Sequence, residues 1–383
     1  MGKSIDKATK HLWKGRWLDT FYALEHCPIC GEFWTFRFYG KHSYVWECKA
    51  CNKAGGLQEL LADLKEAGKY IPEMEGIFDD LVLPEGPDGL IVLSQHKPHV
   101  NTNCMATGFN TIDRLTGGLE EGMLTILTGE QRHGKSTFAG QLALNAVHEG
   151  IGVCFYSGEL NADIFQRWIY GQAAGAQWMN EYKDRFDVSR YKVDEYASGR
   201  ISAWLGSKFI LHDNTYCKAS EGNAVIKSFI TARRHFYCKL FFADNLMTMK
   251  NEAGTESGYW REQSKLVGNL VDFAQQERVH VILVAHPKKE KTDDLNKNVA
   301  GVQEVTQRSS FVLTVEKLTP KMRDVLFSKG ELENKETTNV VHVSKNRVWG
   351  DEGKLELAFE PKSKRLLELP EQKSLQYGWE DFS

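Results

Sequence analysis

The sequence contains no run of about 18 consecutive apolar residues, the length that a helix needs to cross a bilayer. An integral membrane protein is therefore not expected. The N-terminal stretch also lacks the apolar core of a secretory signal, so we expect a cytoplasmic protein. The formal net charge is only -3 over 383 residues, so any affinity for nucleic acid must come from local basic patches.

Cysteine is scarce and unevenly placed. Four of the eight cysteines form two CxxC pairs, and the other four are scattered. This usage excludes a disulfide scaffold and favours a reducing compartment. Cys27, Cys30, Cys48 and Cys51 have the spacing of a two-knuckle, four-cysteine site, so we predict a small β zinc ribbon that holds Zn²⁺.

The chain has 383 residues, which is more than a single hydrophobic core usually organises, so we predict more than one domain. We expect a zinc-ribbon domain with a supporting helix (1–67), a linker (68–104), an ATPase domain (105–370) and an acidic-aromatic C-terminal tail (371–383). In the third of these, short β-rich apolar runs alternate with helical stretches, which predicts an α/β fold with a mostly parallel sheet. Beyond Ser310 only strands are expected, appended antiparallel to one edge.

One segment fits the phosphate-binding pattern GxxxxGK[ST] between a predicted strand and a predicted helix. Its backbone N–H groups would cradle phosphates, Lys135 would reach the β and γ phosphates, and Ser136 would bind Mg²⁺. The predicted nucleotide-binding residues are Gly129, Glu130, Gln131, Arg132, His133, Gly134, Lys135, Ser136 and Thr137. A chance match in a loop is the alternative.

Two acidic residues follow buried strands and suit the chemistry of hydrolysis. Asp244 ends the apolar run Leu240 to Ala243, where a carboxylate would hold Mg²⁺. Glu159 would emerge on the same edge of the sheet, so we predict that it is the general base that polarises the attacking water. The alternative for both is a solvated acid at the end of a strand.

With these motifs in place, the chain resembles the DnaB-type hexameric helicases, including the Twinkle-like and phage primase-helicases, with a RecA-like P-loop NTPase core. The resemblance covers Thr107 to Leu369 and rests on the segments TGFNTIDRLTGG, SGEL, DNL, LVAHP and SKNR. It implies a hexamer that uses ATP or another NTP or dNTP to move 5′ to 3′ on single-stranded DNA and to unwind forks. It also implies that His286 senses the γ-phosphate and that Lys345 and Arg347, on one face of an extended segment, act on the neighbouring subunit's site.

The resemblance weakens where DNA-contacting loops are expected. In the segment 301–310 only Gly301 and Gln307 match the family pattern, and Arg308 is a candidate phosphate contact. Two other candidate DNA loops are the lysine-rich stretch that contains Lys288, Lys289, Lys291 and Lys297, and the stretch from Lys250 to Lys265. Simple surface solubility is the alternative for both.

The remaining interpretations concern partners. The zinc ribbon resembles those of primases, which implies contact with single-stranded DNA; a protein-docking ribbon is the alternative, and no primase activity is expected in this chain alone. A separate primase, a single-strand-binding protein and a DNA polymerase are expected partners, the last through the acidic-aromatic tail from Trp379 to Ser383. An inert frayed end is the alternative for this tail. A RadA-like recombination ATPase is the competing class, and a KaiC-like signalling ATPase a more distant one.

Overall fold

A computed structural model describes residues 6, 9–10, 12–18, 21–39, 45–70, 104–215, 222–249, 256–286, 303–370 and 375–380. The chain forms two compact units, Met1–Val100 and Asn101–Ser383. Most of the predicted linker lies outside the described residues, as do Lys41, His42 and Tyr44 of the ribbon. In the part of the chain that is described, no helix is both long and apolar enough to cross a membrane.

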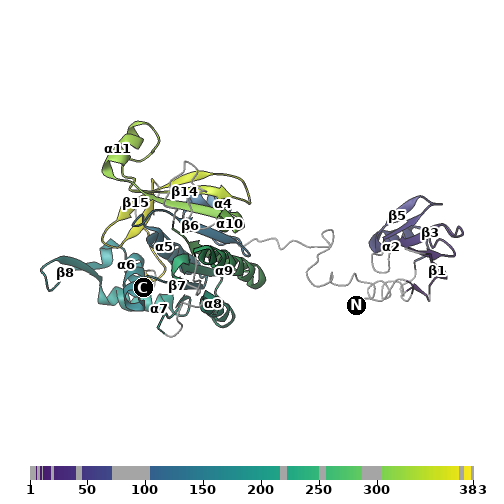
Figure 1. Ribbon diagram of the computed structural model, residues 1–383, viewed down its shortest axis with the longest axis horizontal. Coiled ribbons are helices and arrows are strands. Elements are labelled where there is room, and N and C mark those ends of the chain that lie inside the picture. The colour runs from purple at the N-terminus through teal and green to yellow at the C-terminus, as the bar shows by residue number, and fades with distance from the viewer. Residues whose placement is uncertain are drawn as a thin grey trace. The chain divides into compact units, whose positions relative to one another are not determined.

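The described part of the first unit contains a small antiparallel sheet that is followed by helix α2 (Figure 1). Its strands follow one another in chain order: β1 (Gly15–Leu18), β2 (Phe21–Leu24), β3 (Phe36–Tyr39), β4 (Val45–Cys48) and β5 (Lys53–Gly55). Helix α2 (Leu57–Glu66) follows β5, and Leu60 and Leu64 of this helix are fully buried. Alternate residues of β3 point into the core, so Phe36 and Phe38 are buried while their neighbours are not.

A nine-stranded sheet organises the second unit. In spatial order its strands are β10 (Phe209–Leu211), β7 (Val153–Ser157), β11 (Leu240–Asp244), β12 (His280–Val284), β6 (Leu124–Thr128), β13 (Phe311–Lys317), β14 (Asn339–Asn346), β15 (Gly353–Glu360) and β16 (Arg365–Glu368). The first six strands are parallel and the last three are antiparallel. This is the predicted α/β architecture.

Helices cover both faces of this sheet (Figure 1). The cores on the two faces are built from alternating residues of the same strands, for example Phe155 and Phe242 on one face and Cys154 and Phe241 on the other. The first face carries α4 (Asn110–Thr116), α5 (Lys135–His148), α6 (Ala162–Ala174) and α7 (Glu195–Leu205). The second carries α8 (Gly222–Phe236) and α9 (Glu256–Glu277).

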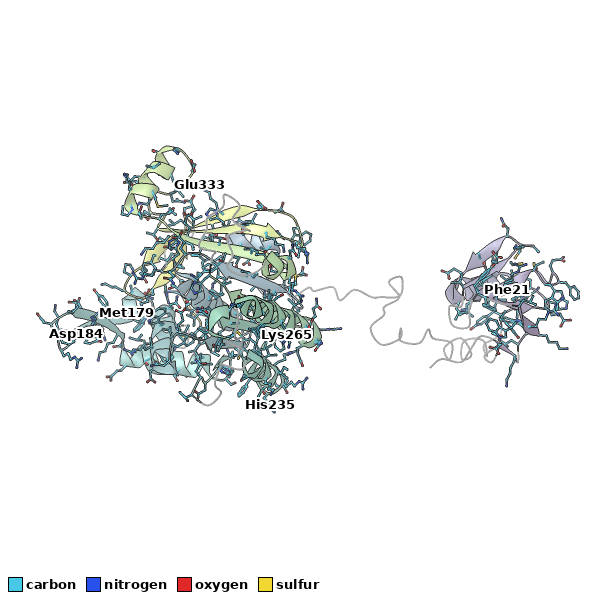
Figure 2. The ribbon with its side chains drawn as sticks, in the orientation of Figure 1. Phe21, Met179, Asp184, His235, Lys265 and Glu333 are labelled. Atoms are coloured by element: carbon cyan, nitrogen blue, oxygen red, sulfur yellow. The ribbon has the colours of Figure 1, made fainter. Side chains whose placement is uncertain are left out.

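Three features of the second unit differ from the prediction. First, β13 pairs in parallel with β6, so the antiparallel addition begins one strand later. Second, helix α11 (Pro320–Ser328) lies between β13 and β14, where only strands were expected; Thr319 caps its first turn and Pro320 begins it, a combination that favours helix initiation. Third, a hairpin of β8 (Met179–Lys183) and β9 (Ser189–Val193) follows the short 3-10 helix η2 (Ala176–Trp178) and interrupts the βαβ pattern. The hairpin projects from the rest of the second unit, with Met179 at its base and Asp184 near its tip (Figure 2).

The expectation that Trp379 is available to a partner is wrong. Trp379 and Tyr377 are each only 1% exposed. The Trp379 indole donates a hydrogen bond to the Ala173 carbonyl at the end of α6, and the Tyr377 hydroxyl donates one to Asn145 of α5. Residues 375–380 are therefore part of the second unit's core, because their aromatic rings complete the apolar face that α5, α6 and α7 share. The rest of the predicted acidic-aromatic tail, 371–374 and 381–383, lies outside the described residues.

Replacing Trp379 with alanine should destabilise the second unit by about 3 to 5 kcal/mol, because it empties a fully buried aromatic site. The Ala173 carbonyl loses its indole donor but keeps the hydrogen bond from Arg365. The matched control is Trp349→Ala, since that ring is 62% exposed, and it should cost about 1 kcal/mol or less. Denaturant unfolding of both variants measures the difference. Equal, small losses would contradict the burial of Trp379.

Candidate nucleotide site and metal centre

Four of the predicted catalytic residues meet at the carboxyl edge of the parallel sheet. Lys135 begins the helix that follows β6, Glu159 follows β7, Asp244 ends β11 and His286 follows β12. Because β7, β11, β12 and β6 are adjacent and parallel, their carboxyl ends lie side by side. Four segments that are distant in the sequence thus contribute to one site.

The phosphate loop is held tightly against β13 and against its own backbone. Gly129 has φ +144°, and a Cβ there would come within 2.2 Å of the Val315 carbonyl oxygen, so only glycine fits. The Lys135 ammonium donates to the carbonyl oxygens of Gly129 (2.7 Å) and Glu130 (2.9 Å). Burial lowers the pKa of Lys135, and the nearby carboxylates of Asp244 and Glu159 oppose that shift.

Asp244 is 6% exposed and accepts a hydrogen bond from the Ser136 side chain. Burial raises the pKa of its carboxyl to about 6; the Ser136 hydrogen bond and the Lys135 charge lower it, while the charge of Glu159 raises it further. A hydroxyl and a buried carboxylate in contact are hard oxygen donors of the kind that bind Mg²⁺. Ser136 and Asp244 therefore fit the predicted magnesium site, with Mg²⁺ supplying charge neutralisation for the phosphates.

The raised pKa of Asp244 has a consequence for stability. A carboxyl whose folded pKa lies above its unfolded value stabilises the fold at pH below about 4, and this contribution is lost as pH rises through about 6. At pH 8 without Mg²⁺, Asp244→Asn should therefore raise the free energy of unfolding by on the order of 3 kcal/mol, because one pKa unit corresponds to about 1.4 kcal/mol. At pH 4 the gain should vanish.

Denaturant unfolding in EDTA at the two pH values measures this effect. Asp163→Asn, which removes an exposed carboxylate at the start of α6, is the control for the change in net charge. Hydrolysis should be lost in Asp244→Asn and kept in the control. A stability gain that is equal at both pH values would show that Asp244 is not the titrating group.

The Glu159 and His286 side chains come together at this edge of the sheet. The Glu159 side chain is 60% exposed, and its Oε1 lies 3.8 Å from Nε2 of His286, whose side chain is 20% exposed. Burial lowers the pKa of His286, and the Lys135 charge lowers it further while Glu159 opposes the shift. An exposed carboxylate beside a neutral imidazole and a lysine is suited to accept a proton from water at the γ-phosphate position.

The turn that carries Glu159 permits only glycine at position 158. A Cβ on Gly158 would lie 1.8 Å from Oγ1 of Thr248 in the short 3-10 helix η3 (Leu246–Thr248). The Gly158 N–H also donates to the Asp244 carbonyl at 2.5 Å. The position of the glutamate is therefore set by backbone contacts between β7 and β11.

Lys345 and Arg347 do not join the site of their own chain. The prediction that both lie on one extended segment is wrong at Arg347, because β14 ends at Asn346 and Arg347 begins an exposed turn. The Lys345 ammonium donates to the carbonyl oxygens of Thr306 and Ser309, just after helix α10 (Gln303–Arg308). Burial, and then the charge of Arg347, lowers the pKa of Lys345.

The candidate DNA loops are only partly described. The four predicted lysines that follow His286 lie outside the described residues, as does Gly301. In the stretch from Lys250 to Lys265 the loop prediction is wrong from Glu256 onward, because that part is helix α9. Gln307 and Arg308 lie at the exposed end of α10, so Arg308 remains a prediction for a phosphate contact.

The four predicted zinc ligands meet in the first unit. The sulfur atoms of Cys27, Cys30, Cys48 and Cys51 all lie within 4.8 Å of one another, and those of Cys30 and Cys48 are 3.8 Å apart. Zn–S bonds of about 2.3 Å in a tetrahedron place sulfur atoms about 3.8 Å apart, so the cluster fits zinc. Although burial raises the pKa of Cys48, hydrogen bonds from Cys51 and Thr35 lower it to about 6, which favours the thiolate that a metal requires.

The aromatic and basic residues of the ribbon divide between its interior and its surface. Trp46, Phe36 and Phe38 are fully buried and fill the core. Trp34 is 41% exposed and lies beneath the guanidinium of Arg16, at 4.7 Å. Arg37 covers Phe21 in the same way, so two arginine–aromatic pairs lie near the surface.

Comparison with known proteins agrees with this geometry. The sequence model of the DnaB-like helicase C terminal domain matches residues 104–368. The chain belongs to the DnaB-like helicase family. The matched segment contains the phosphate loop, Glu159, Asp244, His286 and Arg347, so the residues at the carboxyl edge and the exposed arginine all lie within the family domain.

Replicative helicases and their domains are among the proteins that this chain resembles. The replicative DNA helicase DnaB of Helicobacter pylori is 20% identical over 251 residues, which are 64% of this chain and 50% of that protein, so the chain spans about half the length of this relative. The solved structure of a DnaB-like replicative helicase, described with its interactions with primase, has a TM-score of 0.52 at 19% identity over 81% of this chain and 70% of that one. The ATPase domain of G40P has a TM-score of 0.53 at 19% identity over 83% of this chain and all of that one. At these identities the two structures establish the fold.

The geometry of this DnaB-like domain contains one residue that motif reading did not single out. Asn245, next to Asp244, contacts both Glu159 and His286 through its side-chain amide. The sequence signal for it is small: a polar residue directly after the acid at the end of a buried strand. The contacts with Glu159 and His286 depend on how three strands align, which no local pattern shows.

Proposed function

We propose that the protein is a ring-forming replicative DNA helicase that uses ATP or another NTP or dNTP to move 5′ to 3′ on single-stranded DNA and to unwind duplex at forks. One observation carries the proposal: Lys135, Asp244, Glu159 and His286 converge at one sheet edge inside a DnaB-like domain. In this site Lys135 and the phosphate loop bind phosphates, Ser136 and Asp244 hold Mg²⁺, and Glu159 accepts a proton from the attacking water.

Assembly follows from the position of Arg347. This arginine is exposed on the turn after β14, outside the site of its own chain. Transition-state charge at the γ-phosphate is commonly stabilised by an arginine supplied by another subunit. A closed ring, most simply a hexamer, would place Arg347 of each subunit beside the nucleotide of the next. Lys345 would act at the same interface after leaving the carbonyl oxygens that it now contacts.

The partners follow the same logic. Single-stranded and forked DNA are the proposed substrates. The zinc ribbon is proposed to bind single-stranded DNA or a replication protein. A separate primase and a single-strand-binding protein are proposed to act beside the ring.

The argument for a polymerase contact through Trp379 no longer holds, because the Trp379 side chain is buried. The proposed setting is a bacterial or phage-infected cytoplasm, which the bacterial relative supports. A RadA-like recombination role is less well supported, since the family match is to DnaB-like helicases.

Replacing Glu159 with glutamine should lower kcat for NTP hydrolysis by about 10²- to 10⁴-fold, because the amide cannot accept the proton. Nucleotide binding should persist, since the phosphate loop is unchanged. Hydrolysis with and without single-stranded DNA, together with binding of a fluorescent nucleotide, measures both effects.

The control is Glu149→Gln, an exposed glutamate at the end of α5, which should behave as the wild type does. Single-stranded DNA should stimulate hydrolysis by the wild type and by this control. Stimulated hydrolysis that survives Glu159→Gln would remove Glu159 from the general-base role.

A further inference from the structure

The side-chain amide of Asn245 is held in one orientation between Glu159, the proposed general base, and His286, the proposed γ-phosphate sensor. Asn245 is 3% exposed and follows Asp244 directly. The backbone N–H of Thr248 donates to its Oδ1 at 3.2 Å. Because only the oxygen can accept this hydrogen bond, the NH₂ group must face the opposite way. That side is where Glu159 and His286 lie.

The NH₂ group contacts both of these residues. Its nitrogen lies 2.5 Å from Oε1 of Glu159 and 3.1 Å from Nε2 of His286. An amide NH₂ can only donate and carries two hydrogens, so Nε2 of His286 is the acceptor and the ring proton sits on Nδ1. The neutral imidazole that this arrangement requires agrees with the lowered pKa of His286.

The contact with the carboxylate restrains a side chain that is otherwise mostly in solvent. Glu159 is 60% exposed, and a glutamate with that much freedom samples several rotamers. A hydrogen bond to an ionised carboxylate is stronger than one between neutral groups. A general base is effective only while it stays within hydrogen-bond reach of the proton that it accepts.

We propose that Asn245 is a positioning residue that couples His286 to Glu159. Whether His286 contacts the Asn245 amide or the nucleotide then determines how the Glu159 carboxylate is oriented. This inference rests on the proposed function of the site. When His286 turns toward a γ-phosphate, the amide, still held by Thr248, loses its nitrogen acceptor and donates to Glu159 alone. The contact that His286 makes with the nucleotide thereby changes how the Glu159 carboxylate is held.

A purely structural role for Asn245 makes a different prediction. In that case the residue only supports the turn through the hydrogen bond that Thr248 donates. Asn245→Asp separates the two roles, because the aspartate keeps the shape and an acceptor for Thr248 but has no N–H to donate, and it repels Glu159. Asn245→Ala removes both functions.

The experiment measures steady-state hydrolysis by the full chain for Asn245→Asp, Asn245→Ala, His286→Ala and the double variant Asn245→Ala/His286→Ala. We expect kcat to fall by about tenfold or more in both Asn245 variants, with KM and nucleotide Kd unchanged. Asn245→Asp buries a second carboxylate beside Asp244 and so should lower the melting temperature; kcat is therefore compared well below that temperature, where the variant is folded. The double variant should be no slower than the slower single variant, because the two residues act as one unit.

Asn214→Ala is the matched control. Its amide donates to the Ser157 carbonyl at 2.6 Å and so supports the turn that carries Glu159, without a described contact to the Glu159 carboxylate or to His286. Its effect should multiply with that of His286→Ala. Two results would overturn the coupling. One is a wild-type kcat in Asn245→Asp, and the other is a double variant whose fold reduction in kcat equals the product of the reductions in Asn245→Ala and His286→Ala.

The inference and the proposed function fail in distinguishable ways. A wild-type chain that hydrolyses no NTP in the presence of Mg²⁺ and single-stranded DNA overturns both. Hydrolysis that requires Glu159 but is indifferent to Asn245 overturns the coupling alone.

Discussion

Replacing Arg347 with alanine should lower kcat for DNA-stimulated hydrolysis by about 10³- to 10⁵-fold, the range for arginines that stabilise a phosphoryl-transfer transition state. Nucleotide binding to each subunit should be almost unchanged, because Arg347 lies outside the site of its own chain and is exposed on the turn after β14. Hydrolysis and nucleotide binding measured on one preparation test both statements.

A mixing experiment shows which subunit the arginine serves. Rings formed from Arg347→Ala and Glu159→Gln subunits contain some interfaces that combine an intact Glu159 with an intact Arg347, so the mixture should hydrolyse NTP faster than either variant alone. Arg190→Ala is the control, because this arginine is 57% exposed on the β8–β9 hairpin and its loss should leave hydrolysis unchanged. Full activity of Arg347→Ala would contradict an arginine supplied by a neighbour.

Replacing Cys48 with serine should unfold the first unit and leave the second folded. Zinc binding supplies on the order of 10 kcal/mol to small structural sites, which is comparable with the whole stability of a small domain. The core that remains is one sheet face and one helix, centred on Trp46, Phe36 and Phe38. Zinc content, limited proteolysis and calorimetry measure the outcome.

The control for this experiment is Cys104→Ser, because Cys104 is a free cysteine outside the cluster. It should keep the full zinc content. Basal hydrolysis without DNA should be the same in both cysteine variants, since the two compact units have separate cores. A Cys48→Ser chain that still resists proteolysis in residues 12–66 would show that the ribbon does not depend on metal.

Local chemistry made much of the site predictable. The phosphate loop needs glycines and a lysine in a fixed order, and a zinc-binding cluster of thiolates needs paired cysteines. Both motifs are therefore recognisable from short segments of the sequence. The acids Glu159 and Asp244 were predictable because parallel strands bring their carboxyl ends to one edge. The strand alternation that builds both faces of the sheet follows from the same apolar runs.

The features that escaped prediction depend on tertiary contacts. Trp379 at an acidic chain end looks like a free tail, and only its packing in the core that α5, α6 and α7 share shows that it is buried. Helix α11 has no buried residue, so it lacks the apolar periodicity that marks most helices. Asn245 acts through two side chains from other strands, and no sequence spacing records that alignment.

Unwinding of forked duplexes tests the central claim most directly. Forks with either a 5′ or a 3′ single-stranded loading arm are incubated with the full chain, NTP and Mg²⁺, with Glu159→Gln as the inactive control. The account predicts unwinding that requires the 5′ arm and disappears in the variant. DNA-stimulated hydrolysis accompanied by strand exchange, with no unwinding of either fork, would contradict it and favour a recombination ATPase.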